Sequence, residues 1–559
     1  MKFKNALVNK LKDNFYVKIS EFDFFRLSLF FGLSYLLLLL TTNLFFNSFI
    51  GVKIEIDSRP YFHLLDDPMI NFRASYNFWL NGNPYINPEE SVSAISTLFW
   101  PIIISPIYSL VTYEYAIVVF YLLSILIYSL TICLICNNEK NNFKAILKAL
   151  LLILTPASQT YASSFWEHVP QALLVTLAFI LIYNDFKKYK FLKISNLSFL
   201  ILCSSFIFRP DSAPIIFVIG IYWTITNFFP KGYFQFNLLS FLTGLICLAF
   251  LASHIYGMLY FFSDIKPNTA YLKILSFKDS FLLGIKYLFD PLSSNYWLPI
   301  FLFICIFYSK FNLAQKLIIK CLIAQIVYII YVGGDIFVNS RFFIFLIPIL
   351  VVLFFDFLDI LFKKFHKKAI NQKMYIVIVA VILVAQYLNP TNLKNYLLYK
   401  SNGSLKNQES SIRSQIILAD KIKKNLEPSD GSIGLHYLGI SYHLPDFHVV
   451  DFLGKANEHI AKSNYKNLLI GHNKWDYSYS FENFNIAVVP LYYWNYETAL
   501  NRGKTGNFVG DEEGFWNAAA EYIIKTGEYT FIYPNELNIK KNLSLGLFVR
   551  NDLISKIKK

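Results

Sequence analysis

Long uncharged apolar runs, separated by short polar loops, fill the first two-thirds of the chain. A helix that crosses a bilayer needs about 20 consecutive, mostly apolar residues, and the run from Leu27 to Val52 exceeds that length. Twelve apolar segments can be marked out, at about residues 24–44, 94–111, 113–135, 145–164, 168–184, 194–208, 212–229, 235–256, 296–309, 316–332, 342–362 and 374–389. The pattern therefore predicts a polytopic α-helical membrane protein.

After Asn389 the pattern changes to alternating short strands and amphipathic helices. Five runs have the composition and alternation of strands, at Ile433–His436, His448–Leu453, Asn485–Pro490, Thr530–Tyr533 and Leu545–Val549. Helical patterns lie between them, at Ser411–Leu426 and Gly514–Thr526. We therefore expect a transmembrane domain over residues 1–389 and a soluble α/β domain over residues 390–559.

The composition excludes the main soluble classes of protein. Of 559 residues, 55% are hydrophobic and only 16% are charged, whereas about a quarter of the residues of a soluble protein are charged. The six cysteines lie in or at the edge of apolar segments, so neither a disulfide framework nor a cysteine-based zinc site is predicted. A disordered chain, a disulfide scaffold and a soluble α/β enzyme are all excluded.

The net charge of +14 does not indicate nucleic-acid binding, because the lysines are concentrated in short loops at 136–147, 185–193 and 363–373. Such loops face the cytoplasm by the positive-inside rule. The N-terminus is also basic, and no small-residue cleavage site follows the first apolar run, so we expect an uncleaved first span. By alternation, the loop 45–93 and residues 390–559 lie on the outer side.

Segment 94–111 does not fit this alternation as a further span. It is interrupted by Pro101 and Pro106, so we expect it to lie along, or dip into, the outer interface. About eleven crossings remain, with the N-terminus inside. The outer loops carry the unusual polar residues, whereas the inner loops carry mostly lysine, so any chemistry is expected on the outer face.

The first candidate for chemistry is the pair Asp66-Asp67, just outside the first span. Neighbouring carboxylates raise one another's pKa, which suits a general base near neutral pH. The alternative is that they cap a helix that begins at Pro68. Both can hold together, because a helix N-terminus also attracts an anion.

The stretch that follows, from Met69 to Gly82, contains Arg73 and several aromatic residues. Its pattern predicts an amphipathic helix that lies in the membrane interface. Such a helix anchors the chain to the bilayer, and the anchoring would also serve a lipid-linked substrate.

Three further polar motifs lie between apolar segments, at predicted outer turns: Glu167-His168, Arg209-Pro210-Asp211, and Gly333-Gly334-Asp335 followed by Arg341. Ionisable groups at membrane depth are candidates for function, and arginine can hold a phosphate with two hydrogen bonds. The alternative is that each motif is only a polar turn or a self-satisfied ion pair. Together with Asp66-Asp67 they predict one charged cluster on the outer face.

These motifs carry a family resemblance. The block from Asp66 to Arg73, continued by Asn81–Glu90 and Ser96–Trp100, resembles the opening signature of bacterial polytopic glycosyltransferases of the GT-C architecture, which include the terminal arabinofuranosyltransferases of mycobacterial cell-wall synthesis. Further segments resemble that family's later motifs, at Ser164–Glu167, Arg209–Asp211, Gly333–Asp335, Arg341-Phe342, Val450–Gly454, His459–Ala461 and Gly471–Asp476. The turn Ser164-Phe165-Trp166-Glu167 lacks the family's glycine, and Ser93-Ala94-Ile95 replaces its Gly-Tyr-Thr, so the acceptor side of the pocket is expected to differ.

The resemblance implies an enzyme of the bacterial inner membrane that uses a polyprenyl-phosphate-linked sugar, often a furanose pentose, on the outer side of the bilayer. The acceptor would be an envelope glycan, lipid or protein, with the C-terminal domain in the periplasm helping to position it. Asp66 or Asp67 is then the expected base, and Arg209 and Arg341 the phosphate clamp. The rest of the expected substrate-binding set is Arg73, Glu167, His168, Asp211 and Asp335. No cofactor is required, because arginine can neutralise the phosphate, and the sequence leaves a divalent metal open.

Other functions remain open at this stage. A hexose or mannose transferase of the same architecture, acting on lipopolysaccharide or protein, would show the same motifs. A lipid-linked sugar transporter or flippase also has many spans and intramembrane charges, but it would place them near mid-membrane. A structural or assembly scaffold predicts no convergent cluster.

Overall fold

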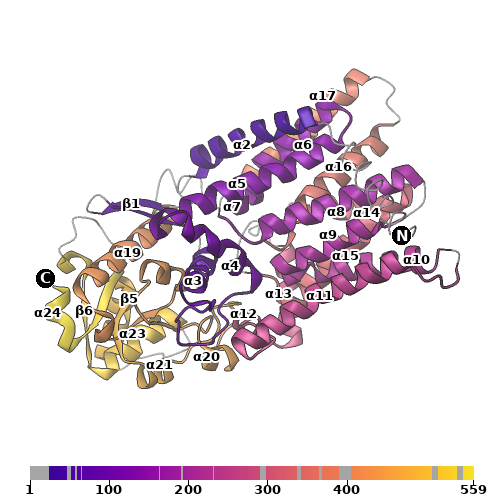
Figure 1. Ribbon diagram of the computed structural model, residues 1–559. Helices are drawn as coiled ribbons and strands as arrows, with labels where there is room; N and C mark the ends of the chain where they lie inside the picture. Colours follow the sequence, from indigo (N-terminus) through magenta and orange to yellow (C-terminus); the bar gives the residue numbers. More distant parts are fainter. Residues whose placement is uncertain are drawn as a thin grey trace.

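The computed structural model describes residues 24–46, 52–56, 59–64, 66–162, 164–189, 193–230, 232–289, 297–335, 341–363, 368–388, 404–505, 514–537 and 545–558. A bundle of apolar helices forms one end of the molecule and a mixed α/β domain forms the other (Figure 1). A thin layer of short elements lies between the two. The lysine-rich N-terminus lies outside the described residues, as do parts of the loops 185–193 and 363–373.

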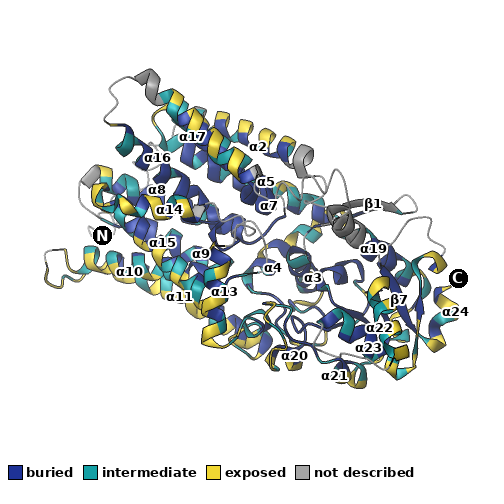
Figure 2. Ribbon diagram, turned by 180° about the vertical axis from the view of Figure 1, so that it is seen from behind, coloured by how far each residue is buried: buried dark blue, intermediate teal, exposed yellow. Residues whose placement is uncertain are grey.

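The bundle is built from helices of very different lengths. They are α2 (Phe24–Phe46), α5 (Tyr113–Asn138), α6 (Asn142–Leu154), α7 (Pro156–Ala162), α8 (His168–Tyr189), α9 (Asn196–Phe208), α10 (Ala213–Phe228), α11 (Leu238–Phe262), α13 (Phe277–Phe289), α14 (Trp297–Ile306), α15 (Leu313–Val332), α16 (Ile347–Phe362) and α17 (Lys368–Leu388). Many outward side chains on α10, α11 and α17 are exposed (Figure 2) and apolar, such as Leu248 and Val381. A surface of this kind is typical of helices that face lipid.

The structure supports the prediction of about eleven crossings only in part, because its described residues contain candidate membrane spans but fewer of them. Among the described residues, four helices are long and apolar enough to cross a membrane: α5, α8, α11 and α15. The pair α6 and α7 adds a fifth if it is counted as one span bent by 66°. Other predicted spans correspond to shorter apolar helices, such as the 13-residue α9. The described residues therefore contain four or five candidate membrane spans, as expected of a membrane protein, and the number eleven stays a prediction.

The α/β domain has the five predicted strands, each within three residues of its expected bounds. They are β3 (Ser432–Leu435), β4 (Val449–Asp451), β5 (Ile486–Tyr492), β6 (Tyr529–Ile532) and β7 (Leu545–Arg550). The sheet order is β4-β3-β5-β7-β6, with β3 parallel to both neighbours and β7 antiparallel to both of its own. Its main helices are α19 (Ser404–Asn425), α20 (Glu458–Lys462), α21 (Tyr477–Asn483), α22 (Tyr493–Thr505), α23 (Phe515–Thr526) and α24 (Ile554–Ile557). The two predicted helices correspond to α19 and α23.

The layer between the two ends holds a hairpin that the sequence analysis did not predict, β1 (Val52–Ile56) with β2 (Arg59–His63). It also holds α3 (Asp66–Asn81), α4 (Phe99–Ile104) with the 3-10 turn η1 (Ser105–Ser109), and α12 (Asn268–Tyr271). The predicted break in segment 94–111 falls after Ile104, where the α-helix changes to the 3-10 turn that contains Pro106. Both parts pack near α3.

Helix α3 is a buried connecting helix rather than the surface helix that its amphipathic pattern predicted. Met69, Phe72 and Ala74 are fully buried. The ring of Phe72 stacks on Phe120 of α5 with centroids 4.4 Å apart. Tyr442 of the α/β domain, called the outer domain below after its predicted side of the membrane, meets the same ring at 6.3 Å. The apolar face is thus covered by protein from both ends, and only the last turn exposes large side chains.

Arg73 ties α3 to the outer domain. Its guanidinium is fully buried and donates to the backbone carbonyl oxygens of Ile86 at 3.2 Å, Leu444 at 3.1 Å and Phe447 at 3.4 Å. The structure therefore places this predicted substrate-binding residue in a structural role, because its donors are used by carbonyl groups.

We expect Arg73→Met to lower the free energy of unfolding by about 3 kcal/mol, because it removes three buried hydrogen bonds that the guanidinium donates. The midpoint of thermal unfolding of the detergent-solubilised protein should fall by several degrees. Lys504→Met, at an exposed position of α22, is the matched control and should leave the midpoint unchanged. Equal midpoints for the two variants would contradict the structural role.

Candidate active site between the helical bundle and the outer domain

Asp66 and Asp67 form the first turn of α3, which begins two residues before the Pro68 that the capping alternative took as its start, and both also contact the outer domain. The amino group of Lys455 donates to Asp66 Oδ2 at 3.0 Å and to Asp67 Oδ1 at 2.9 Å. Asp66 Oδ1 accepts the backbone N–H of Gly439 at 2.7 Å, and a Cβ at that glycine would lie 2.7 Å from the same oxygen. Only glycine lets the two backbones approach so closely.

A tight turn after β4 positions Lys455. Asp451, the last residue of the strand, accepts the backbone N–H groups of Leu453 at 2.9 Å and Ala456 at 2.7 Å. Gly454 adopts a positive φ of 85°, and a Cβ there would lie 2.9 Å from the backbone nitrogen of Ala461. The turn therefore holds Lys455 against the carboxylates of α3.

Arg341 connects the acidic pair to the Gly-Gly-Asp turn. Its Nη1 lies 3.1 Å from Asp67 Oδ2 and 3.4 Å from Asp335 Oδ2, and its guanidinium lies over the Trp166 ring, 4.3 Å from the centroid. Lys273, from the turn between α12 and α13, lies 3.5 Å from the same Asp335 oxygen. Cations and carboxylates thus alternate in a continuous row from Lys455 to Lys273.

These groups line a small cavity at the junction. Its lining is Asp67, Ser96, Thr269, Leu272, Lys273, Asp335, Arg341, Lys455, Ile470, Gly471 and His472. The free space is about 40 Å³, room for a few water molecules. Three cationic side chains face two carboxylates, so the lining carries a net positive charge.

The other predicted site residues form a second buried cluster. Arg209 pairs with Glu167 and donates to Asp211 Oδ2 at 2.8 Å. His168 Nε2 lies 3.9 Å from that same oxygen. Trp166 links this cluster to the cavity. It directly precedes Glu167 of the cluster, and its ring packs against the guanidinium of Arg341, which lines the cavity. The structure thus brings Arg209, Glu167, His168 and Asp211 together but does not place them in the cavity lining.

The ion pairs fix the protonation states around the cavity. Burial raises the pKa of Asp67, but Lys455 and Arg341 outweigh it and hold this pKa well below its usual range. Burial lowers the pKa of Lys455, but the two aspartates outweigh it and raise this pKa above its usual range. The expectation that adjacent carboxylates raise each other's pKa is therefore wrong for Asp67, because the cations outweigh the repulsion. Burial and Lys455 lower the pKa of His472 to about 4.

These pKa values predict a flat pH dependence for the reaction at this site. From about pH 5 to 8, Asp67 stays ionised, Lys455 stays protonated and His472 stays neutral. We expect kcat/KM to be constant over this range and to fall only as the pH approaches 4. The stability that neutral His472 contributes is lost in the same direction, since the unfolded chain binds its proton first, from about pH 6.5 downward.

The measurement is kcat/KM in lipid nanodiscs across this pH range, for the natural protein and for His472→Gln. An acid limb near pH 6.5 that disappears in His472→Gln would contradict the environment described here.

Three ionisable residues of the cavity were not among the predicted site residues: Lys455, Lys273 and His472. Lys455 directly follows the Val450–Gly454 patch, and His472 lies in the Gly471–Asp476 patch, so the patches were a signal for both. Lys273 has no local signal, since it lies in an ordinary polar stretch. Among the described residues, no three His, Cys, Asp or Glu side chains are arranged to hold a metal ion.

No protein-family model and no curated protein matches this chain.

Proposed function

We propose that this protein is a membrane glycosyltransferase that moves a sugar from a polyprenyl-phosphate donor to an envelope glycan, lipid or protein acceptor. The sugar is of the pentofuranose kind, and the reaction takes place on the outer side of a bacterial inner membrane. The observation that carries the proposal is the cavity itself, in which three cations and an ionised carboxylate meet where an apolar bundle joins a polar domain.

The donor phosphate enters by exchanging partners with the side chains already present. Since the free space is about 40 Å³, a phosphate enters by taking Arg341, Lys273 and Lys455 from the carboxylates that hold them. Asp67 then loses its counter-charges, and its pKa rises toward that of an effective base. Donor binding thereby produces the base at the point where it is used.

The transfer step is a substitution at the anomeric carbon. Asp67 accepts the proton of the acceptor hydroxyl, whose oxygen forms the new bond to that carbon. The bond from the carbon to the phosphate oxygen breaks, and polyprenyl phosphate leaves with its charge neutralised by the cations.

The lipid tail of the donor has an apolar route to this cavity. Helix α13 begins four residues after Lys273, and its exposed residues include Phe277, Phe281 and Leu282. A polyprenyl chain that lies along this surface presents its phosphate to Lys273. The charges also collect at the end of the bundle next to the outer domain rather than at its middle, which favours a transferase over a transporter.

The test uses the full-length protein in nanodiscs with three synthetic donors: undecaprenyl-phosphate arabinofuranose, mannose and glucose. The acceptor is the delipidated glycan and glycoprotein fraction of envelopes from cells that lack the gene. Mass spectrometry should detect free undecaprenyl phosphate and a matching mass increase in the acceptor, with the pentofuranose donor preferred. A preference for mannose or glucose would support the hexose alternative. The absence of turnover with every donor, together with identical envelope glycans in cells with and without the gene, would overturn the proposal.

A further inference from the structure

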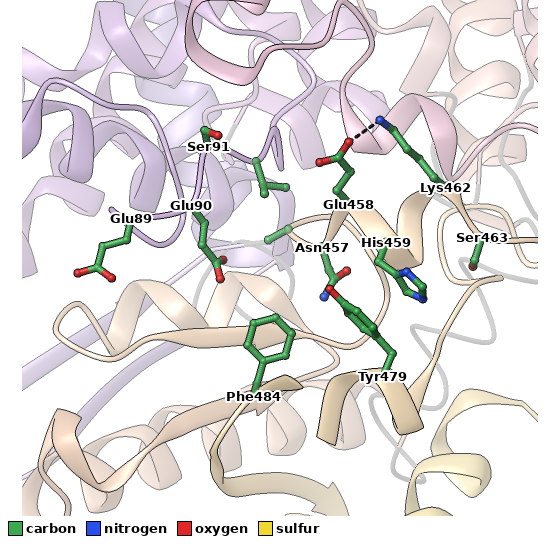
Figure 3. A pocket seen from close by; sticks show the side chains of 12 residues that line it. Glu89, Glu90, Ser91, Asn457, Glu458, His459, Lys462, Ser463, Tyr479 and Phe484 are labelled. Atoms are coloured by element: carbon green, nitrogen blue, oxygen red, sulfur yellow. Dashed lines mark hydrogen bonds and ion pairs between the residues drawn. The ribbon is translucent and has the colours of Figure 1, made fainter. Parts of the chain in front are cut away.

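A second, larger pocket lies on the outer domain, between the loop at residues 89–92 and the helices α20 and α21 (Figure 3). Its volume is about 790 Å³, within the range of about 300–1,000 Å³ that is typical of ligand sites. In Figure 3 the side chains of Glu90, Asn457, Tyr479 and Phe484 gather toward one another, whereas Glu89 lies at the edge.

One wall of the pocket is a row of aromatic rings. His459 stacks on Tyr479 with centroids 3.9 Å apart and an interplanar angle of 15°. Tyr479 meets Phe484 at 6.1 Å, and Phe484 stacks on His448 at 5.8 Å. Rings that are packed against one another lose little freedom on binding, and they offer flat faces to the C–H groups of a sugar ring.

A second wall, which adjoins the row of rings at His448, supplies fixed hydrogen-bonding groups. The carboxylate of Glu90 accepts from His448 Nε2 at 2.9 Å and from Asn87 Nδ2 at 2.7 Å. Burial raises the pKa of Glu90, but these two hydrogen bonds outweigh it and hold this pKa below its usual range. Asn457 uses its Oδ1 to cap α20, so its amide nitrogen is the end left to donate.

The charge of the pocket selects against anions. Glu89, Glu90 and Glu458 line it, while the cation Lys462 is paired with Glu458 and with Asp264 at 3.1 Å. A sulfated, phosphorylated or uronic-acid chain would meet a lining in which carboxylates outnumber cations. A hydroxyl-rich chain without anionic groups fits both walls.

The pocket and the candidate active site are formed by neighbouring residues of the same two segments. Ala456 and Asn457 line the pocket, and Lys455 lines the active-site cavity. Val92 lines the first, and Ser96 lines the second. Asn268 joins the two segments, because its backbone N–H donates to the Ser93 carbonyl at 3.1 Å and its Nδ2 donates to the Lys455 carbonyl at 3.2 Å.

We propose that this pocket binds the acceptor, a glycan chain without anionic groups, and directs its growing end toward Asp67 and Lys455. The proposal rests on the transferase function proposed above and adds the acceptor class and its binding site. Tyr479 provides the stacking face, and Glu90 accepts hydrogen bonds from the hydroxyl groups.

The test compares Tyr479→Ala and Glu90→Gln with two matched controls on α22, Tyr493→Ala and Glu497→Gln, which are exposed and do not line the pocket. The acceptor probe is the glycan fraction of cells that lack the gene. We expect the pocket variants to raise the acceptor KM at least fivefold and to leave the donor KM within twofold of the natural value. The controls should match the natural protein in both constants. An unchanged acceptor KM in both pocket variants would overturn the proposal.

A binding measurement separates this proposal from the proposed function. Saturation-transfer NMR on Asp67→Asn, which is expected to transfer about a thousandfold more slowly, should show contact with the glycan fraction when no sugar donor is present, and hexagalacturonate, an anionic chain, should not compete. Tyr479→Ala should lose the signal, and its thermal unfolding midpoint shows whether it is folded. Glycan binding without transfer from any sugar donor would contradict the proposed transferase function and would support glycan binding at this pocket. Transfer with unaltered binding in folded Tyr479→Ala would defeat the site alone.

Discussion

Replacing Asp67 with asparagine is expected to lower the rate of sugar transfer by about a thousandfold, within the range found when a general base is removed. The amide keeps the size of the side chain and its place at the start of α3, but it cannot accept a proton. The ion pairs to Lys455 and Arg341 are lost with the charge. The release of undecaprenyl phosphate, measured by mass spectrometry in nanodiscs, reports the rate.

Asp66→Asn is the matched control, because Asp66 also contacts Lys455 but is tied to the Gly439 backbone and does not line the cavity. We expect it to lower transfer less than tenfold. Asp67→Glu should keep part of the activity, since the carboxylate is retained at a displaced position. If Asp67→Asn and Asp66→Asn transferred equally well, the base would have to be another group.

The site residues that could be predicted from the sequence are charged residues at the ends of apolar segments. Asp67 and Arg341 stand out because a charged side chain beside a membrane segment is costly unless it is paired or used. The structure brings these two within 3.1 Å of each other, although 273 positions separate them by number. The strands of the outer domain were predictable for a similar reason, because their alternating patterns contrast with the loops around them.

Lys455 could not be recognised in this way. A lysine in a polar domain does not interrupt an apolar segment, so the neighbouring Val450–Gly454 patch was its signal, and its partner Asp67 lies 388 residues earlier in the chain. Helix α3 shows a related limit: its pattern reveals an apolar face but not what covers that face. Lipid was the expected cover, and Tyr442 and Phe120 take that place in the structure. The structural contact of Arg73 follows from this burial, since its guanidinium is fully enclosed and three of its N–H groups donate to backbone carbonyl oxygens.

Arg341→Gln is expected to lower kcat/KM for transfer by about a hundredfold to a thousandfold. A loss of this size is typical when a fixed hydrogen-bond donor that stabilises the charge developing in the transition state is removed. Arg341 lies between Asp67 and Asp335 and over the Trp166 ring, so it is held in place before the donor arrives. Arg341→Lys should recover only part of the loss, because an ammonium group cannot give two parallel hydrogen bonds or stack as a guanidinium does. Arg550→Gln, which breaks a surface pair with Asp552, is the control and should transfer at the natural rate.

A pH profile distinguishes a role in charge from a role in folding. Without Arg341, Asp67 loses one of the two cations that lower its pKa most, so this pKa rises and the acid limb of the transfer rate should move upward in Arg341→Gln. Loss of folded protein would lower the rate at every pH and leave the limb where it was. Since Lys455 remains beside Asp67 in Arg341→Gln, the acid limb should move less than in Lys455→Met, which removes the cation that lowers the pKa of Asp67 most. An Arg341→Gln profile that has the natural limb and a donor KM within twofold of the natural value would show that the phosphate is held by other groups. The pH profiles of both variants therefore test whether Lys455 and Arg341 keep Asp67 ionised. If they do, the acid side of the profile moves to higher pH in both variants, and it moves further in Lys455→Met than in Arg341→Gln.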